Sequence, residues 1–167
     1  DKDAGTLTIA DNGIGMNRDC LISDLGTIAR SGTTAYLEEH QDEDGADLNA
    51  IGKFGVGFYS AFMVSTEVEV ISKRAGEDQA WRWVSDGTGE FTISEGEREG
   101  RGTTIRMKLR KDEDEFLEEP RLRHIIKTYS DHIALPIVLK GADGEEEAVN
   151  AASALWTRQK KDITDEQ

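Results

Sequence analysis

Alternating apolar and polar residues predict several strands. Residues 6–10 alternate over five positions, the pattern of a half-buried strand. The same period of two recurs at residues 68–73, 80–85, 90–93 and 103–109, with turn residues between these segments. We therefore expect a sheet of mostly antiparallel strands, with residues 135–139 as a last strand of the set.

Three segments between these strands have helical features instead. Asn17 can cap a helix over residues 18–25, and a glycine-rich turn at 51–57 leads into an apolar helix at 58–64. Pro120 stands in the first turn of a helix over residues 121–132, with an apolar face that includes Tyr129. The fold class we predict is α+β, a two-layer sandwich with helices on one face of a mostly antiparallel sheet.

Composition narrows the class of protein. The 167 residues suit one domain, and 34 acidic against 20 basic residues give a net charge of −14, which argues against nucleic-acid binding. Cys20 is the only cysteine, so a disulfide framework is excluded and a reducing, cytoplasmic location is favoured. No apolar run is long enough to span a membrane, and the three histidines lack metal-ligand spacing. The chain opens without Met, and we expect it to be a fragment of a longer protein.

The first candidate site follows the first strand, at residues 11–16 (DNGIGM). The carboxylate of Asp11 can accept a hydrogen bond from an amino group such as that of adenine. Gly13 and Gly15 allow the backbone to pass close to a flat ring. An ordinary strand-to-helix turn has the same residues, so this motif alone does not separate the two interpretations.

Two further segments could contact a nucleotide. The glycines at 52–57 precede a helix and can turn several amides toward a phosphate, although neither the P-loop nor the Rossmann spacing is present. A flexible hinge is the alternative. The hydroxyl of Thr103 can bond adenine directly or through a water, or simply belong to a threonine-rich strand.

Together these motifs resemble the GHKL ATPases, which share the Bergerat ATP-binding fold. The longer strings at residues 25–33, 51–62 and 129–133 resemble the ninety-kilodalton heat-shock chaperones within that superfamily. Similarity covers nearly the whole chain, and residues 154–157 resemble the entry to the middle domain of those chaperones. The resemblance implies an ATP-binding domain at 1–140, followed by an acidic linker and the start of a middle domain at 141–167.

The resemblance also implies the roles of particular residues. Asp11 would hold the adenine amine, and residues 25–51 would form a lid that closes over ATP. Lys53 could either contact a phosphate or point to solvent, and Asp24 is assigned no binding role. The remaining nucleotide-binding residues would be Gly15, Met16 and Thr103 in the base pocket, Leu25 as an apolar wall, and Gly55, Val56, Gly57 and Phe58 at the phosphates.

The whole protein would be a slow, ATP-hydrolysing chaperone of the stress response that acts on unfolded client proteins as a homodimer. In the family, a general-base glutamate and a magnesium-ligating asparagine lie on a helix that would precede Asp1. We therefore expect no catalytic or metal-binding residue in this chain, N-terminal helices to be lacking, and little hydrolysis by the chain alone. Two alternatives remain: the ATP domain of a histidine kinase, and a module that binds partners without enzymatic activity.

Overall fold

The computed structural model describes residues 1–27, 54–141 and 144–152. The chain forms two compact units. One comprises Ala4–Glu113, and the other comprises Asp1–Asp3 and Asp114–Gln167. Within the described residues, no helix is both long enough and apolar enough to cross a membrane.

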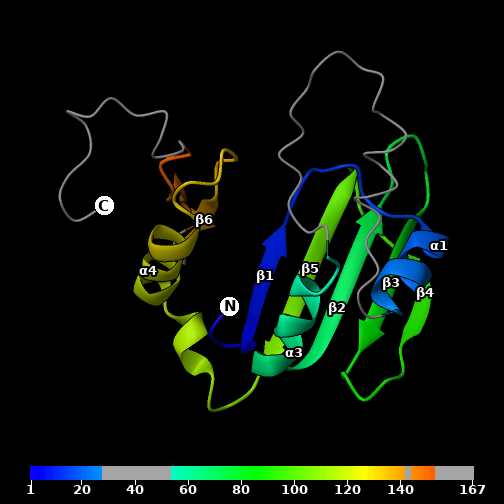
Figure 1. The fold of residues 1–167 in the computed structure, drawn as a ribbon, viewed down its shortest axis with the longest axis horizontal. Helices are drawn as coiled ribbons and strands as arrows, with labels where there is room; N and C mark the ends of the chain where they lie inside the picture. The colour runs from blue at the N-terminus through cyan, green and yellow to red at the C-terminus, as the bar shows by residue number, and fades with distance from the viewer. Residues whose placement is uncertain (28–53, 142–143, 153–167) are drawn as a thin grey trace. The chain divides into compact units, whose positions relative to one another are not determined.

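The larger unit contains a five-stranded sheet in the order β1-β5-β2-β3-β4, with every neighbouring pair antiparallel (Figure 1). Its strands are β1 Thr6–Ala10, β2 Ser65–Lys73, β3 Ala80–Ser85, β4 Thr92–Gly96 and β5 Gly102–Leu109. The strands predicted from alternation are present, although β4 begins two residues later than expected. The predicted α+β class with a mostly antiparallel sheet is confirmed.

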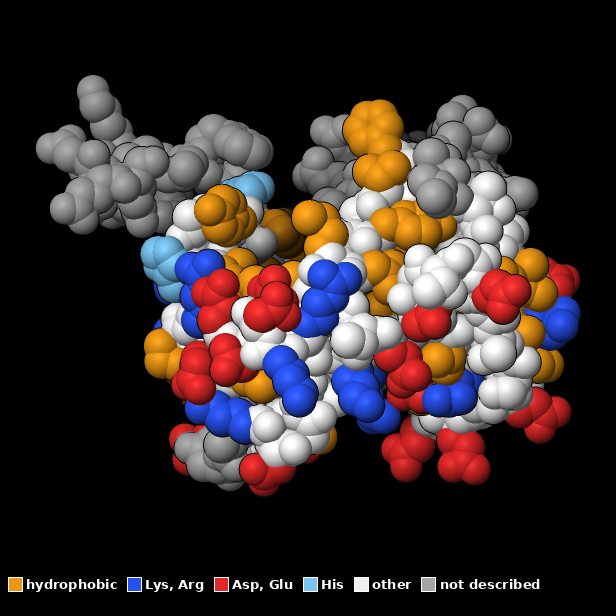
Figure 2. All heavy atoms as spheres, turned by 90° about the horizontal axis from the view of Figure 1, so that it is seen from below, with side chains coloured by type: hydrophobic (Ala, Val, Ile, Leu, Met, Phe, Trp, Pro, Cys, Tyr) orange, Lys and Arg blue, Asp and Glu red, His pale blue; other side chains and the backbone are white. Residues whose placement is uncertain are grey.

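The two faces of this sheet differ in chemistry because the side chains of each strand alternate between them. On one face, Glu69 of β2 forms ion pairs with Arg82 of β3 and, at 3.0 Å, with Arg106 of β5. Figure 2 views the molecule from below, not onto either face of the sheet, and there acidic and basic side chains both occur across the surface. The opposite face of β2 is buried and carries Val68, Val70 and Ser72.

Short helices cover this buried face. They are α1 Arg18–Cys20, the π-helix η1 Leu21–Leu25, the 3-10 turn η2 Gly57–Ser60 and α3 Ala61–Val64. The guanidinium of Arg18 lies 5.9 Å from the ring centroid of Trp81, and the ring of Phe62 lies 6.5 Å from that of Trp83. Because both tryptophans lie on the same face of β3, α1 and α3 share one side of the sheet (Figure 1). The predicted cap is also present: the Asn17 carboxamide oxygen accepts from the amide of Cys20 at 3.0 Å.

The smaller unit contains η3 Asp114–Leu117, α4 Glu119–Ser130, β6 Val138–Lys140 and β7 Glu146–Ala148. Pro120 lies in the first turn of α4, as expected, but Tyr129 of the expected apolar face is 71% exposed. Our expectation that residues 135–139 join the main strand set was wrong, because β6 pairs with β7 in a separate sheet.

A buried amide joins residue 150 to the segment that precedes β6. The side chain of Asn150 accepts from the amide of Ile137 at 2.7 Å and donates to the carbonyls of Ile133 and Leu135 at 3.0 and 2.9 Å. These bonds join residues 13 to 17 positions apart, so the local alternation used for prediction does not reveal them.

Candidate functional site

A row of side chains crosses one end of the main sheet, on its helix-covered face. In the strand register, Ser72 of β2 lies opposite both Thr103 of β5 and Trp81 of β3. The amide of Asp11 donates to the carbonyl of Thr103 at 2.8 Å, which extends the pairing of β1 and β5 by one residue. Asp11, Thr103, Ser72 and Trp81 therefore occupy successive strands on one face, which brings two of the predicted base-binding residues together.

Backbone amides hold the carboxylate of Asp11. Its Oδ1 accepts from the amide of Gly13 at 2.8 Å and from the amide of Thr103 at 3.2 Å. The residue is exposed, so the carboxylate is fixed in direction without being removed from solvent. A carboxylate offers about four acceptor positions, so these two bonds leave capacity for a ligand amine.

Gly15 is required by the backbone path of the following loop. Its φ is +70°, and a Cβ built there would lie 1.9 Å from the carbonyl oxygen of Lys73. Next to it, the amide of Met16 donates to the hydroxyl of Ser72 at 2.8 Å. The loop after β1 therefore lies directly against the end of β2, close to Thr103, whose hydroxyl is 2.9 Å from that of Ser72.

Two arginines that the sequence analysis did not single out hold the turn after β1. The guanidinium of Arg98 donates to the carbonyl of Asp11 at 2.6 Å and also contacts the hydroxyl of Thr104. Arg101 donates to the carbonyl of Gly13 at 2.8 Å and to that of the preceding residue. These pairs lie 87 and 88 positions apart for Asp11 and Gly13, so a reading of local motifs cannot connect them.

A second group contains Leu25 and the residues after the glycine-rich turn. The phenol of Tyr59 donates to the carbonyl of Leu25 at 3.0 Å, and partial burial raises the pKa of Tyr59. The ring of Phe58 packs edge-on against Trp83 with centroids 5.7 Å apart. Gly55 and Val56 precede the 3-10 turn η2, where we expected an α-helix to begin. Residues 28–53, which include most of the predicted lid and Lys53, lie outside the described residues.

Residues 1–99 match the family model described as Histidine kinase-, DNA gyrase B-, and HSP90-like ATPase. The match covers both groups of candidate residues except Thr103. The chain belongs to this family of ATPases.

Similar proteins include three bacterial relatives. The chain is 61% identical over 170 residues to the chaperone protein HtpG of Rhodospirillum rubrum and 59% identical over 167 residues to that of Paramagnetospirillum magneticum. Its identity to the chaperone protein HtpG of Bordetella avium is 51% over 178 residues. Each match covers the whole chain but only 27%, 27% and 28% of the respective relative.

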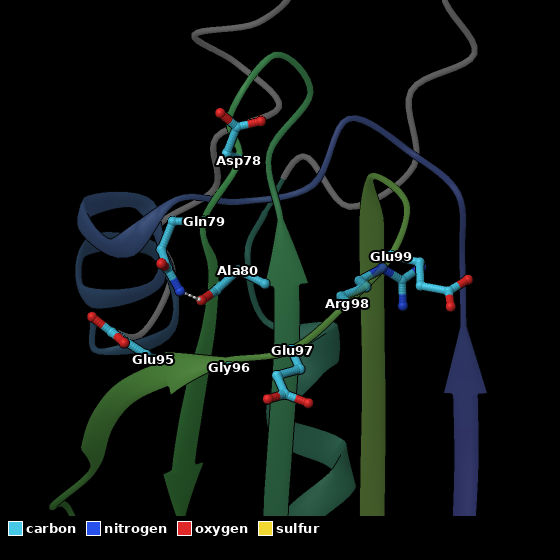
Figure 3. Close-up of a pocket in the computed structure, with 8 residues that line it drawn as sticks. All are labelled: Asp78, Gln79, Ala80, Glu95, Gly96, Glu97, Arg98 and Glu99. Carbon is cyan, nitrogen blue, oxygen red and sulfur yellow. Dashed lines mark hydrogen bonds between the residues drawn. The ribbon is translucent and has the colours of Figure 1, made fainter.

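The described residues also form a cavity of about 650 Å³ that none of the predicted site residues lines. It lies on the sheet face opposite α3, where residues 95–99 cross the strands (Figure 3). Four carboxylates and one guanidinium line it, from Asp78, Glu95, Glu97, Glu99 and Arg98. Such a lining repels phosphates, so this cavity is a poor candidate for the nucleotide site. Among the described residues, no group of three or more His, Cys, Asp or Glu could hold a metal ion.

Proposed function

We propose that this chain binds ATP and ADP as the nucleotide-binding part of an ATP-dependent molecular chaperone. The observation that carries the proposal is the carboxylate of Asp11, held by two backbone amides beside Thr103. The family match supports ATP as the nucleotide, and the relatives named chaperone protein HtpG support the chaperone role.

The adenine amine would donate to Asp11, with Gly15, Met16 and Thr103 around the base and Leu25 as an apolar wall. Gly15 supports this arrangement because its lack of a Cβ allows the loop to lie against β2. The phosphates would meet the amides of residues 55–58, since a chain with a net charge of −14 needs a local source of positive potential.

Residues 25–51 would then close over the nucleotide as a lid, and this closure would couple nucleotide binding to the rest of the protein. Magnesium would arrive with the triphosphate, and we assign none of the described residues to it. We propose that hydrolysis depends on a glutamate and an asparagine ahead of β1, so that this chain alone turns ATP over slowly. If the 167-residue chain hydrolysed ATP as fast as a longer protein that includes this glutamate and asparagine, that dependence would be contradicted.

For the whole protein we propose ATP-driven remodelling of unfolded client proteins by a cytoplasmic homodimer of the stress response, acting away from membranes and nucleic acids. The chaperone names of the relatives support the client class. The chain spans 27% of those two relatives, so dimer and client contacts are assigned to regions outside it.

Calorimetric titration with Mg-ADP tests the nucleotide site, using the unchanged protein and an Asp11→Asn variant. A charged hydrogen bond contributes about 1.5–3 kcal/mol, so we expect the dissociation constant to rise by about 10- to 150-fold. Asp86→Asn is the matched control, because the Asp86 carboxylate also accepts from a turn amide, that of Thr88 at 2.9 Å. Equal affinity of the Asp11→Asn variant and the unchanged protein would refute the assignment of Asp11.

A further inference from the structure

The hydroxyl of Ser72 lies between two of the predicted base-binding residues, Met16 and Thr103. Ser72 is 0% exposed, and three polar groups surround its oxygen. The amide of Met16 donates to it at 2.8 Å, the carbonyl oxygen of Gly102 lies 3.1 Å away, and the hydroxyl oxygen of Thr103 lies 2.9 Å away. Ser72 therefore joins the loop after β1 to the strand that carries Thr103.

Counting hydrogens leaves one arrangement that satisfies all three contacts. The Met16 amide can only donate and the Gly102 carbonyl can only accept, whereas each hydroxyl has one hydrogen. The hydrogen of Ser72 must therefore go to Gly102, and the hydrogen of Thr103 must go to Ser72. In the opposite arrangement, two oxygens would face each other at 3.1 Å with no hydrogen between them.

This arrangement fixes the polarity of the Thr103 hydroxyl. Because its only hydrogen is directed to Ser72, its oxygen can only accept a hydrogen bond from any further partner. The neighbouring carboxylate of Asp11 also only accepts when ionised. Both side chains at this end of the sheet thus present hydrogen-bond acceptors to a ligand.

We propose that Ser72 is a specificity-determining residue, which directs the Thr103 hydrogen away from the ligand and so favours a purine with an amino group at position 6. The proposal rests on the proposed nucleotide-binding function. An amino group has two hydrogens and can donate one directly to each acceptor. A 6-oxo purine has its donor at N1 and an oxygen at position 6, so at position 6 it would place a third acceptor against them, and an unpaired polar contact of this kind is strongly discriminating.

The test compares ADP with inosine diphosphate, which differs from ADP only in its base. Dissociation constants for both nucleotides are measured by calorimetry on the unchanged protein and on the Ser72→Ala and Ser72→Thr variants. In Ser72→Ala the Thr103 hydrogen is free to turn toward the ligand, so we expect the preference for ADP to fall by about fivefold or more. Ser72→Thr retains a hydroxyl and should retain the preference.

If Ser72 had a purely structural role, its removal would lower the affinity for both nucleotides by the same factor. An unchanged ratio of the two dissociation constants in Ser72→Ala would therefore overturn the proposal. Thr103→Val supplies a second test: once the Thr103 hydroxyl is absent, adding Ser72→Ala should alter the ratio no further. A further change in the double variant would also overturn it.

The two levels of proposal fail in different ways. If the unchanged protein does not bind ADP, the proposed function is wrong and this inference fails with it. If it binds ADP but Ser72→Ala leaves the ratio unchanged, the inference alone is wrong.

Discussion

Replacing Gly15 with alanine should damage the site through one methyl group. The backbone at Gly15 has φ of +70°, a conformation that costs a residue with a Cβ about 1–2 kcal/mol. The new Cβ would also lie 1.9 Å from the carbonyl oxygen of Lys73 in β2, which pairs on both sides with other strands. Overpacking of this kind adds about 1–3 kcal/mol, so we expect a total loss of about 2–5 kcal/mol.

Gly5→Ala separates the two contributions. Gly5 has φ of +63°, close to that of Gly15, but a Cβ there would meet no atom within 4 Å. Urea unfolding should therefore show a loss of only about 1–2 kcal/mol for Gly5→Ala. Calorimetry should show weaker ADP binding for Gly15→Ala, whereas Gly5→Ala should bind ADP as the unchanged protein does. Equal destabilisation by both substitutions, with ADP affinity unchanged in each, would refute the argument that Gly15 is needed for the close approach to β2.

Arg98→Gln removes the donor to the carbonyl of Asp11 and should raise the dissociation constant for ADP by about two- to tenfold, whereas Arg123→Gln, in the smaller unit, should leave it unchanged. An ADP affinity equal to that of the unchanged protein would show that Arg98 does not position Asp11. Tyr59→Phe removes the bond to Leu25 and should lower the free energy of unfolding by about 0.5–1.5 kcal/mol near neutral pH. Because burial raises the pKa of Tyr59 above its ordinary 10.0, the folded state holds the phenol proton more tightly. The contribution of the Tyr59 phenol to the free energy of unfolding is therefore complete below about pH 10, and it is lost as the pH rises through the folded-state pKa of Tyr59. Urea unfolding across this range should show a steeper decline for the unchanged protein than for Tyr59→Phe, and parallel declines would contradict the assignment.

Local pattern predicted the elements of the larger unit well. Residues 68–73 of β2 alternate between buried and partly exposed, because one face is covered by short helices and the other carries ion pairs such as Glu69 with Arg106. Asn17 was recognisable as a cap because its role depends on the amide three residues later. The smaller unit was predicted less well. There β6 pairs with β7, and a buried asparagine joins segments that no periodic pattern connects.

Some residues of the candidate site were predicted from local pattern, and others were found only in the structure. The sequence alone proposed Asp11, Gly15 and Thr103 as candidates, because a carboxylate and glycines after a strand have recognisable local chemistry and a family resemblance. It did not identify Arg98 or Ser72, since an arginine in an acidic loop and a serine in a strand carry no distinctive local signal.

Only the tertiary structure assigns Arg98 and Ser72 to the site. Antiparallel pairing of β1 with β5 and of β5 with β2 brings Asp11, Thr103 and Ser72 together from positions up to 92 residues apart. In the larger unit, local residue preferences therefore largely determine which segments become strands, with β4 displaced by two residues. The register between strands determines which hydroxyl donates and which accepts, because hydrogen-bond direction depends on neighbours that are distant in the chain.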